Sequence, residues 1–135
     1  MSAASALQKA IFARLSGDAA LAALVGANGI TDHRIDAPAA PLVVIAGIDS
    51  TDHSTASEAG EAHQVTLEVW SGAAGHREAQ AIAALVRDAL HDAPLTLDGH
   101  RLVLLFHRDT RVRRAEKSRF HRAELRFRAV TEPEG

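Results

Sequence analysis

A strand that turns directly into an amphipathic helix constrains the fold of this chain more than any other segment. In His63–Trp70 the apolar residues Val65, Leu67 and Val69 alternate with polar ones, which is the two-residue period of a strand with one buried face. After Ser71-Gly72 the apolar residues recur at spacings of three and four, as in a helix with one apolar stripe. The stripe consists of Ala79, Ile82, Ala83, Val86, Ala89 and Leu90. A strand and a helix with one apolar side each bury those sides together, so the pair predicts helix packed on sheet.

The flanking segments predict two further helices and several more strands. An Asp98-Gly99 pair between alternating apolar residues predicts a tight hairpin turn. The expected elements are helices over Ala3–Leu15 and Ala19–Val25, a short extended piece over Ile30–Ile35, and strands over Leu42–Ile48, Leu102–Arg113 and Arg119–Thr131. This order predicts one α+β domain over residues 1–135, with a mainly antiparallel sheet and the helices packed on one side.

Length and composition support a single hydrophobic core. A chain of 135 residues with 47% hydrophobic content can bury roughly two thirds of its unfolded surface. The absence of cysteine excludes disulfides, thiolate metal sites and cysteine nucleophiles. We find neither a signal peptide pattern nor a membrane span, and expect a soluble protein made in the cytoplasm. The expected core residues are Leu7, Ile11, Val44, Val65, Leu67, Val69, Ile82, Val86, Leu104, Leu125 and Phe127.

The segment Asp49–Ala62 interrupts the apolar pattern. It is rich in Ser, Thr, Asp, Glu and His, with Gly60 near its end. Such composition predicts a loop, and loops of this length in compact domains are usually functional or disordered until bound. We therefore expect a long, mobile hairpin loop that becomes ordered against a partner.

Charge is unevenly distributed along the chain. The formal net charge is only −2, but residues 1–100 hold 5 basic and 12 acidic side chains while residues 101–135 hold 10 basic and 5 acidic ones. This asymmetry predicts two surfaces of opposite sign, suited to nucleic acid or to subunits that meet through unlike patches. The basic group around the expected final β-turn is Arg108, Arg111, Arg113, Arg114, Lys117, Arg119 and Arg122. The acidic group on or beside the expected long loop is Asp49, Asp52, Glu58 and Glu61.

The basic group has three open interpretations: contact with an acidic patch on another protein, the lining of a channel through which DNA passes, or a solvated hairpin. Phosphate binding would need such cations. Only Phe106 and Phe120 lie nearby in the sequence, which disfavours stacking on single-stranded bases. The candidate interface residues are Asp49, Asp52, Glu58, Glu61, Arg111, Arg113, Arg114, Lys117 and Arg119.

No pattern of reactive side chains predicts catalysis. The eight histidines lack the spacings of known zinc motifs, so we expect them in solvent or in loops, although His63, His107 and His121 could converge on one sheet face. Ser71-Gly72 lacks the leading glycine of a nucleophile elbow, and the glycines and carboxylates do not follow the phosphate-loop or EF-hand patterns. We therefore expect no catalytic residue, no metal site and no cofactor.

Several segments together resemble the tail-completion, or tail terminator, proteins of long-tailed phages and gene transfer agents. The resemblance lies in their order, spacing and the short length, and it covers nearly the whole chain. The segments are Ala6–Leu15, Asp18–Gly26, Ala40–Ile45, His63–Ser71, Gly75–Ala79 and Leu125–Pro133. The resemblance implies an α+β subunit that assembles as a ring, typically a hexamer, on the end of the tail tube and joins it to the head connector.

The expected function is therefore structural, with no enzymatic activity. The expected partners are other copies of the chain, the major tail tube protein and a head connector or stopper protein, with DNA passing through the ring without specific recognition and no membrane contact. The expected location is the virion tail at the head–tail junction. Two alternatives from other classes are a nucleic-acid-binding module that uses the basic hairpin and a small enzyme with histidine chemistry.

Overall fold

The sheet and helices predicted from the periodicity are present in the computed structural model, which describes residues 1–33, 41–116 and 118–134. The elements in chain order are α1 (Ala3–Ser16), α2 (Ala19–Val25), β1 (Ile30–Thr31), β2 (Leu42–Asp52), β3 (Glu61–Ser71), α3 (Arg77–Leu90), β4 (His100–Arg114) and β5 (His121–Pro133). The strands form one five-stranded sheet in the order β1-β2-β3-β5-β4. Only the β1–β2 pair is parallel. The predicted α+β class is confirmed.

The helices begin where the sequence supplies capping groups. The Ser2 side chain accepts a hydrogen bond from the Ser5 N–H at the start of α1, and the Asp18 carboxylate accepts one from the Leu21 N–H at the start of α2. Gly26, with a φ of 80°, ends α2 in a conformation that other residues rarely adopt. The expected Asp98-Gly99 turn is also present, but its pairing is limited to one bridge between Leu97 and His100.

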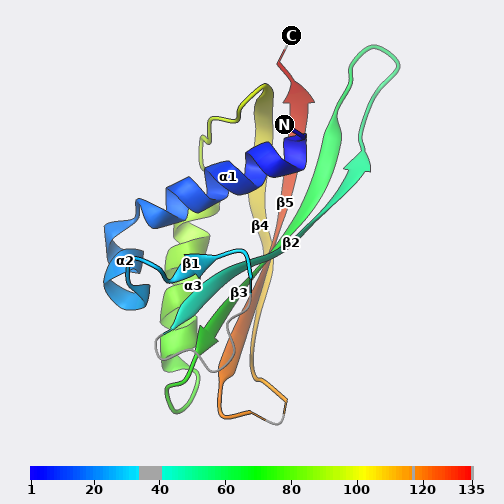
Figure 1. Ribbon diagram of the computed structural model, residues 1–135. Coiled ribbons are helices and arrows are strands. Elements are labelled where there is room, and N and C mark those ends of the chain that lie inside the picture. Colours follow the sequence, from blue (N-terminus) through cyan, green and yellow to red (C-terminus); the bar gives the residue numbers. More distant parts are fainter. Residues whose placement is uncertain (34–40, 117, 135) are drawn as a thin grey trace.

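All of the described helices pack on one face of the sheet, and the main core lies between them and the strands (Figure 1). Nine of the eleven predicted core residues lie in this core and are buried. Val44 is buried too, but it faces the opposite side of the sheet, where it packs with Leu42, Trp70 and Phe120 in a second, smaller cluster. None of the described helices is long and apolar enough to cross a membrane.

Leu104 was wrongly predicted as a core residue, because β4 is not a regular strand. A β-bulge between Leu102 and Leu104 inserts Val103 as an extra residue. An extra residue reverses the side-chain alternation beyond it. Leu105 is therefore the buried residue at 1% exposure, whereas Leu104 is only half-buried.

The expected loop over Asp49–Ala62 is shorter than predicted, because strands occupy both of its ends. The β2–β3 ladder continues to the pair Asp52 and Glu61, so only residues 53–60 connect the two strands. We call residues 53–60 the hairpin tip. The apolar period that identifies strands fails here because most of these side chains are exposed and polar. The mobility of the tip stays a prediction.

Candidate functional site

The sheet face opposite the helices is densely charged, and no described helix covers it; we call it the open face. Charges of opposite sign meet across its strands. Arg126 on β5 donates two hydrogen bonds to the Asp109 carboxylate on β4, from Nε at 2.9 Å and from Nη2 at 2.5 Å. Arg122 lies 3.9 Å from the Glu68 carboxylate on β3. Hydrogen bonding to Arg126 lowers the pKa of Asp109 and raises the pKa of Arg126, so both groups stay charged at neutral pH.

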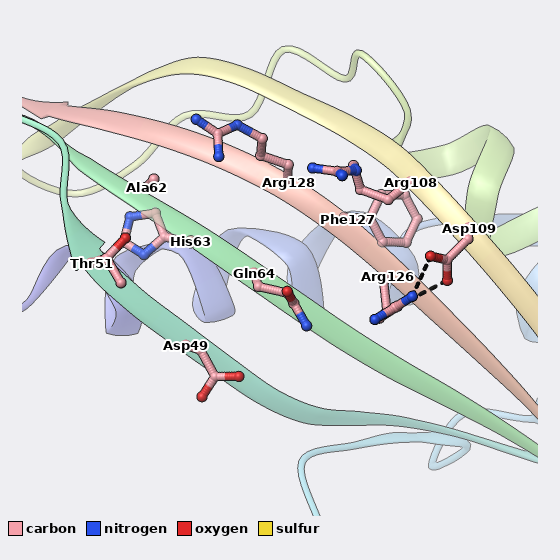
Figure 2. A pocket seen from close by; sticks show the side chains of 10 residues that line it. All are labelled: Asp49, Thr51, Ala62, His63, Gln64, Arg108, Asp109, Arg126, Phe127 and Arg128. Atoms are coloured by element: carbon pink, nitrogen blue, oxygen red, sulfur yellow. Dashed lines mark hydrogen bonds and ion pairs between the residues drawn. The ribbon is translucent and has the colours of Figure 1, made fainter.

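A groove of about 300 Å³ crosses the upper part of this face (Figure 2). Asp49 and Thr51 of β2 line one side, and Arg126 and Arg128 of β5 line the other. Arg108 joins them from β4, where a second bulge between His107 and Asp109 inserts it as an extra residue. Such a bulge turns consecutive side chains toward one face. We call this feature the arginine groove; it is lined by Asp49, Thr51, Ala62, His63, Gln64, Arg108, Asp109, Arg126, Phe127 and Arg128.

The predicted basic residues lie at the end of the sheet where β4 turns into β5 (Figure 1). Arg111 and Arg113 lie on the open face, opposite Glu124 and Arg122 of β5. Arg114 lies opposite His121 on the helix-covered face. The Arg119 guanidinium stacks 4.8 Å from the centre of the Phe120 ring. Lys117 lies outside the described residues.

The predicted acidic residues lie toward the other end of the sheet but do not form one cluster. Asp49 is in the arginine groove on the open face. Asp52 and Glu61 lie directly opposite each other and point to the other face, and Glu58 is in the hairpin tip. Arg111, Arg113 and Arg114 thus lie toward one end of the sheet and Asp52, Glu58 and Glu61 toward the other, but Asp49 shares the arginine groove with Arg108, and each group is split between two faces.

The expectation that the histidines are exposed or in loops is wrong for His63 and His121, which are buried. His63 Nδ1 lies 2.7 Å from Ser50 Oγ, and its Nε2 lies 2.9 Å from Thr131 Oγ1. Burial lowers the pKa of His63, so the ring is neutral at pH 7. The His121 ring instead meets the His76 ring edge-on, with centroids 4.6 Å apart. Within the described residues, no group of three His, Asp or Glu side chains is arranged to hold a metal ion.

The open edge of β4 is partly closed by the end of α3. The Asp92 N–H donates to the Leu105 carbonyl at 2.7 Å, and the His107 N–H donates to His91 Nδ1 at 3.0 Å. These bonds occupy backbone groups that an added strand would need. The charged open face is therefore the stronger candidate for a contact surface than this edge.

The sequence reasoning missed the arginine groove. Arg108 belonged to the predicted basic group, but Arg126 and Arg128 did not. A bulge and the lateral order of strands bring these residues together, and neither has a signal in the sequence. The alternation Arg122, Glu124, Arg126, Arg128 on β5 was the one available sign of a charged face.

Comparison with known proteins supplies the family. The family model of tail completion protein gp17 matches residues 9–132. A solved structure described as the virion of a native gene transfer agent particle contains a chain that is 40% identical, with a TM-score of 0.89 over 97% of this chain and 98% of that chain. No curated protein matches. The protein belongs to the tail completion protein gp17 family and is a structural component of a phage-like virion tail.

Proposed function

We propose that this protein is a tail terminator: several copies, expected to be six, form a ring that caps the tail tube and joins it to the head connector. The observation that carries the proposal is the near full-length likeness to a chain of a gene transfer agent virion. Membership of a tail completion family supports the same role. The likeness supports a structural role in such a particle.

A closed ring of more than two copies needs two different, complementary patches on each subunit. The separation of acidic and basic residues along the sheet supports such an arrangement. The proposed interface residues are Asp49, Asp52, Glu58, Glu61, Arg111, Arg113, Arg114, Lys117 and Arg119. They face neighbouring copies, the tail tube protein or the head connector, while DNA passes through the ring without base-specific contacts.

Particles made without this protein test the proposal. Electron microscopy of negatively stained particles should reveal tubes of uncontrolled length, or tails that never join heads. Supplying the protein in a second step should restore joined particles. Normal particles in its absence would overturn the terminator role.

Nucleic-acid binding through the β4–β5 end is the alternative function. Carboxylates interrupt the arginines there: Glu124 lies opposite Arg111, and Glu68 lies near Arg122. This arrangement disfavours a continuous phosphate-binding surface. Titration with a duplex oligonucleotide at several salt concentrations separates the two functions. A steep loss of affinity with salt would favour nucleic-acid binding, and undetectable binding would favour the terminator.

A further inference from the structure

The arginine groove holds more cationic charge than its own carboxylates compensate. Arg126 is engaged by Asp109 through two hydrogen bonds. The side chains of Arg108 and Arg128 form no hydrogen bond or ion pair with another described residue, and Asp49 is the only other carboxylate among the described residues that line the groove. Guanidinium groups present several N–H donors in a planar fork that matches a carboxylate. The groove is therefore suited to receive carboxylates from outside the subunit.

The hairpin tip is an acidic and internally ordered element. The sequence between Asp49 and Ala62 has no lysine or arginine, and Asp52, Glu58 and Glu61 lie in or beside the tip. The His53 N–H donates to the Gly60 carbonyl at 2.9 Å, and the Thr55 N–H donates to the Glu58 carbonyl at 2.8 Å. A turn with its own hydrogen bonds loses less conformational entropy when it binds than an open loop does.

The tip continues beyond the last β2–β3 pair, Asp52 and Glu61, and cannot reach the groove of its own subunit. Figure 1 shows the end of the β2–β3 hairpin diverging from β4 and β5 at the upper end of the molecule. Asp49 and Thr51 of β2 line the groove, whereas Thr55 in the tip lies three residues beyond the end of β2 at Asp52. The β2–β3 ladder keeps these two points apart. A tip that meets this groove must therefore come from another copy.

We propose that the hairpin tip of one copy lies across the arginine groove of the next, where Glu58 and the flanking carboxylates meet Arg108 and Arg128. This inference rests on the proposed function, because a ring needs such a pair of unlike patches. It assigns the contact between neighbours to the tip and the groove. The basic β4–β5 end then remains available for the tail tube or the connector.

Engineered disulfides test the contact directly, because the chain has no cysteine of its own. We would introduce Glu58→Cys together with Arg108→Cys and oxidise assembled particles and concentrated purified protein with copper phenanthroline. A disulfide forms only where Cβ atoms approach within about 4.5 Å. The expected result is a ladder of covalent multimers on a non-reducing gel. The matched control, Glu58→Cys with Arg113→Cys, should give none; a ladder in the control alone would place the tip at the β4–β5 end and overturn the inference.

A charge exchange provides the second test. Arg108→Glu with Arg128→Glu, or Glu58→Arg with Asp52→Arg, should each weaken self-association by about tenfold or more in sedimentation equilibrium. All four changes in one chain should restore association, because the tip and the groove exchange signs together. Arg87→Glu, a reversal at an exposed position of α3 outside the groove, should leave self-association unchanged. Four changes that fail to restore association in a chain with parental thermal stability would overturn the contact.

The outcomes separate this contact from the terminator role. If particles contain the double-cysteine protein and have joined heads but give no covalent ladder, the groove is wrong and the terminator role stands. If the ladder forms in purified protein while particles lacking the protein are normal, the contact stands and the terminator role fails. A duplex oligonucleotide is added to the non-covalent multimers of the parent chain. If it dissociates them by competing for the groove, phosphate is the ligand of the groove and the carboxylate assignment is overturned.

Discussion

At the scale of single residues, His63 is the polar side chain whose environment differs most from its sequence context. It was expected at an exposed or loop position, but it is 2% exposed and lies between two hydroxyl groups. A neutral imidazole satisfies both hydroxyls because each can donate or accept a hydrogen bond. Protonation would place an unpaired charge inside the sheet, so this residue makes stability depend on pH.

We expect the urea midpoint to fall as the pH decreases below about 6.5. Burial holds the pKa of His63 below its ordinary value of 6.5, so the unfolded chain binds the proton more readily than the folded one. The contribution of neutral His63 to the free energy of unfolding is therefore complete above pH 6.5 and declines in more acidic buffer. Burial also lowers the pKa of His107, which adds to the loss of stability at acidic pH. His63→Gln should make the urea midpoint depend less steeply on pH between 7 and 5. The control, His53→Gln in the exposed tip, should have the same pH dependence as the parent. Equal slopes in the parent and His63→Gln would contradict this.

A second prediction at the residue scale concerns Leu67, which is fully buried between β3 and the helices. Leu67→Ala should lower the free energy of unfolding by about 2–5 kcal/mol, since it removes apolar contacts and leaves a cavity. Val103→Ala is the matched control, because Val103 is 48% exposed at a bulge, and its loss should cost about 0.5 kcal/mol or less. If urea unfolding gives a similar loss of free energy for Leu67→Ala and Val103→Ala, the central strand is wrongly placed.

At the scale of elements, the β2–β3 hairpin combines a stable ladder with a tip that contributes little to the core. The strands pair continuously to Asp52 and Glu61, and His53 pairs with Gly60 beyond them. The exposed residues of the tip pack against none of the buried clusters. The hairpin therefore presents a surface that can change without loss of the fold.

Replacement of Ser54–Ala59 by Asn-Gly should leave thermal stability nearly unchanged, because a two-residue turn of this type can join His53 and Gly60. The same change should abolish assembly into joined particles, because the acidic tip is lost. Thermal unfolding and electron microscopy of particles measure the two effects. A replacement of the same six residues by Gly and Ser keeps the length of the loop and serves as the control for charge. Normal assembly with the Asn-Gly turn would contradict the proposed role of the tip.

At the scale of the whole molecule, the sheet holds the acidic hairpin tip and the basic β4–β5 turn apart and so gives the subunit two ends of different character. The acidic tip lies at one end, and the turn between Arg114 and His121 lies at the other (Figure 1). Exposed charge pairs contribute only about 0–1 kcal/mol each, so they orient partners more than they bind them. Repetition around a ring would sum these small contributions.

Reversal of Arg113 and Arg114 to glutamate should leave the subunit folded but block attachment to the tail. The defect should be most severe at low ionic strength, where charge screening is weakest. Because Arg113 lies on the open face and Arg114 on the opposite face, the single reversals tell which face meets the partner. The fraction of joined particles, counted at low and high salt, is the measurement. Normal joining by the double variant at low salt would mean that this turn is solvated surface.

The sequence by itself determined the elements with a strong apolar period. The strand through Leu67 and the helix through Ile82 and Val86 could be predicted because burial of one face imposes a regular spacing on apolar residues. The capping residues of α1 and α2 were predictable for a similar local reason, since a helix start needs hydrogen-bond acceptors. The tail completion family was also recognisable from the order of these segments.

Only the tertiary structure decided which polar residues meet. The bulge at Val103 reversed the faces of the residues from Leu104 to His107 and so exchanged Leu104 for Leu105 in the core, and the bulge at Arg108 restored the original alternation and placed Arg108 in the groove. The lateral order of strands set Arg126 against Asp109 and His63 against Thr131, pairs that are 17 and 68 residues apart in the chain. Bulges and strand order depend on pairing between distant segments, and exposed polar residues carry no periodic signal of that pairing.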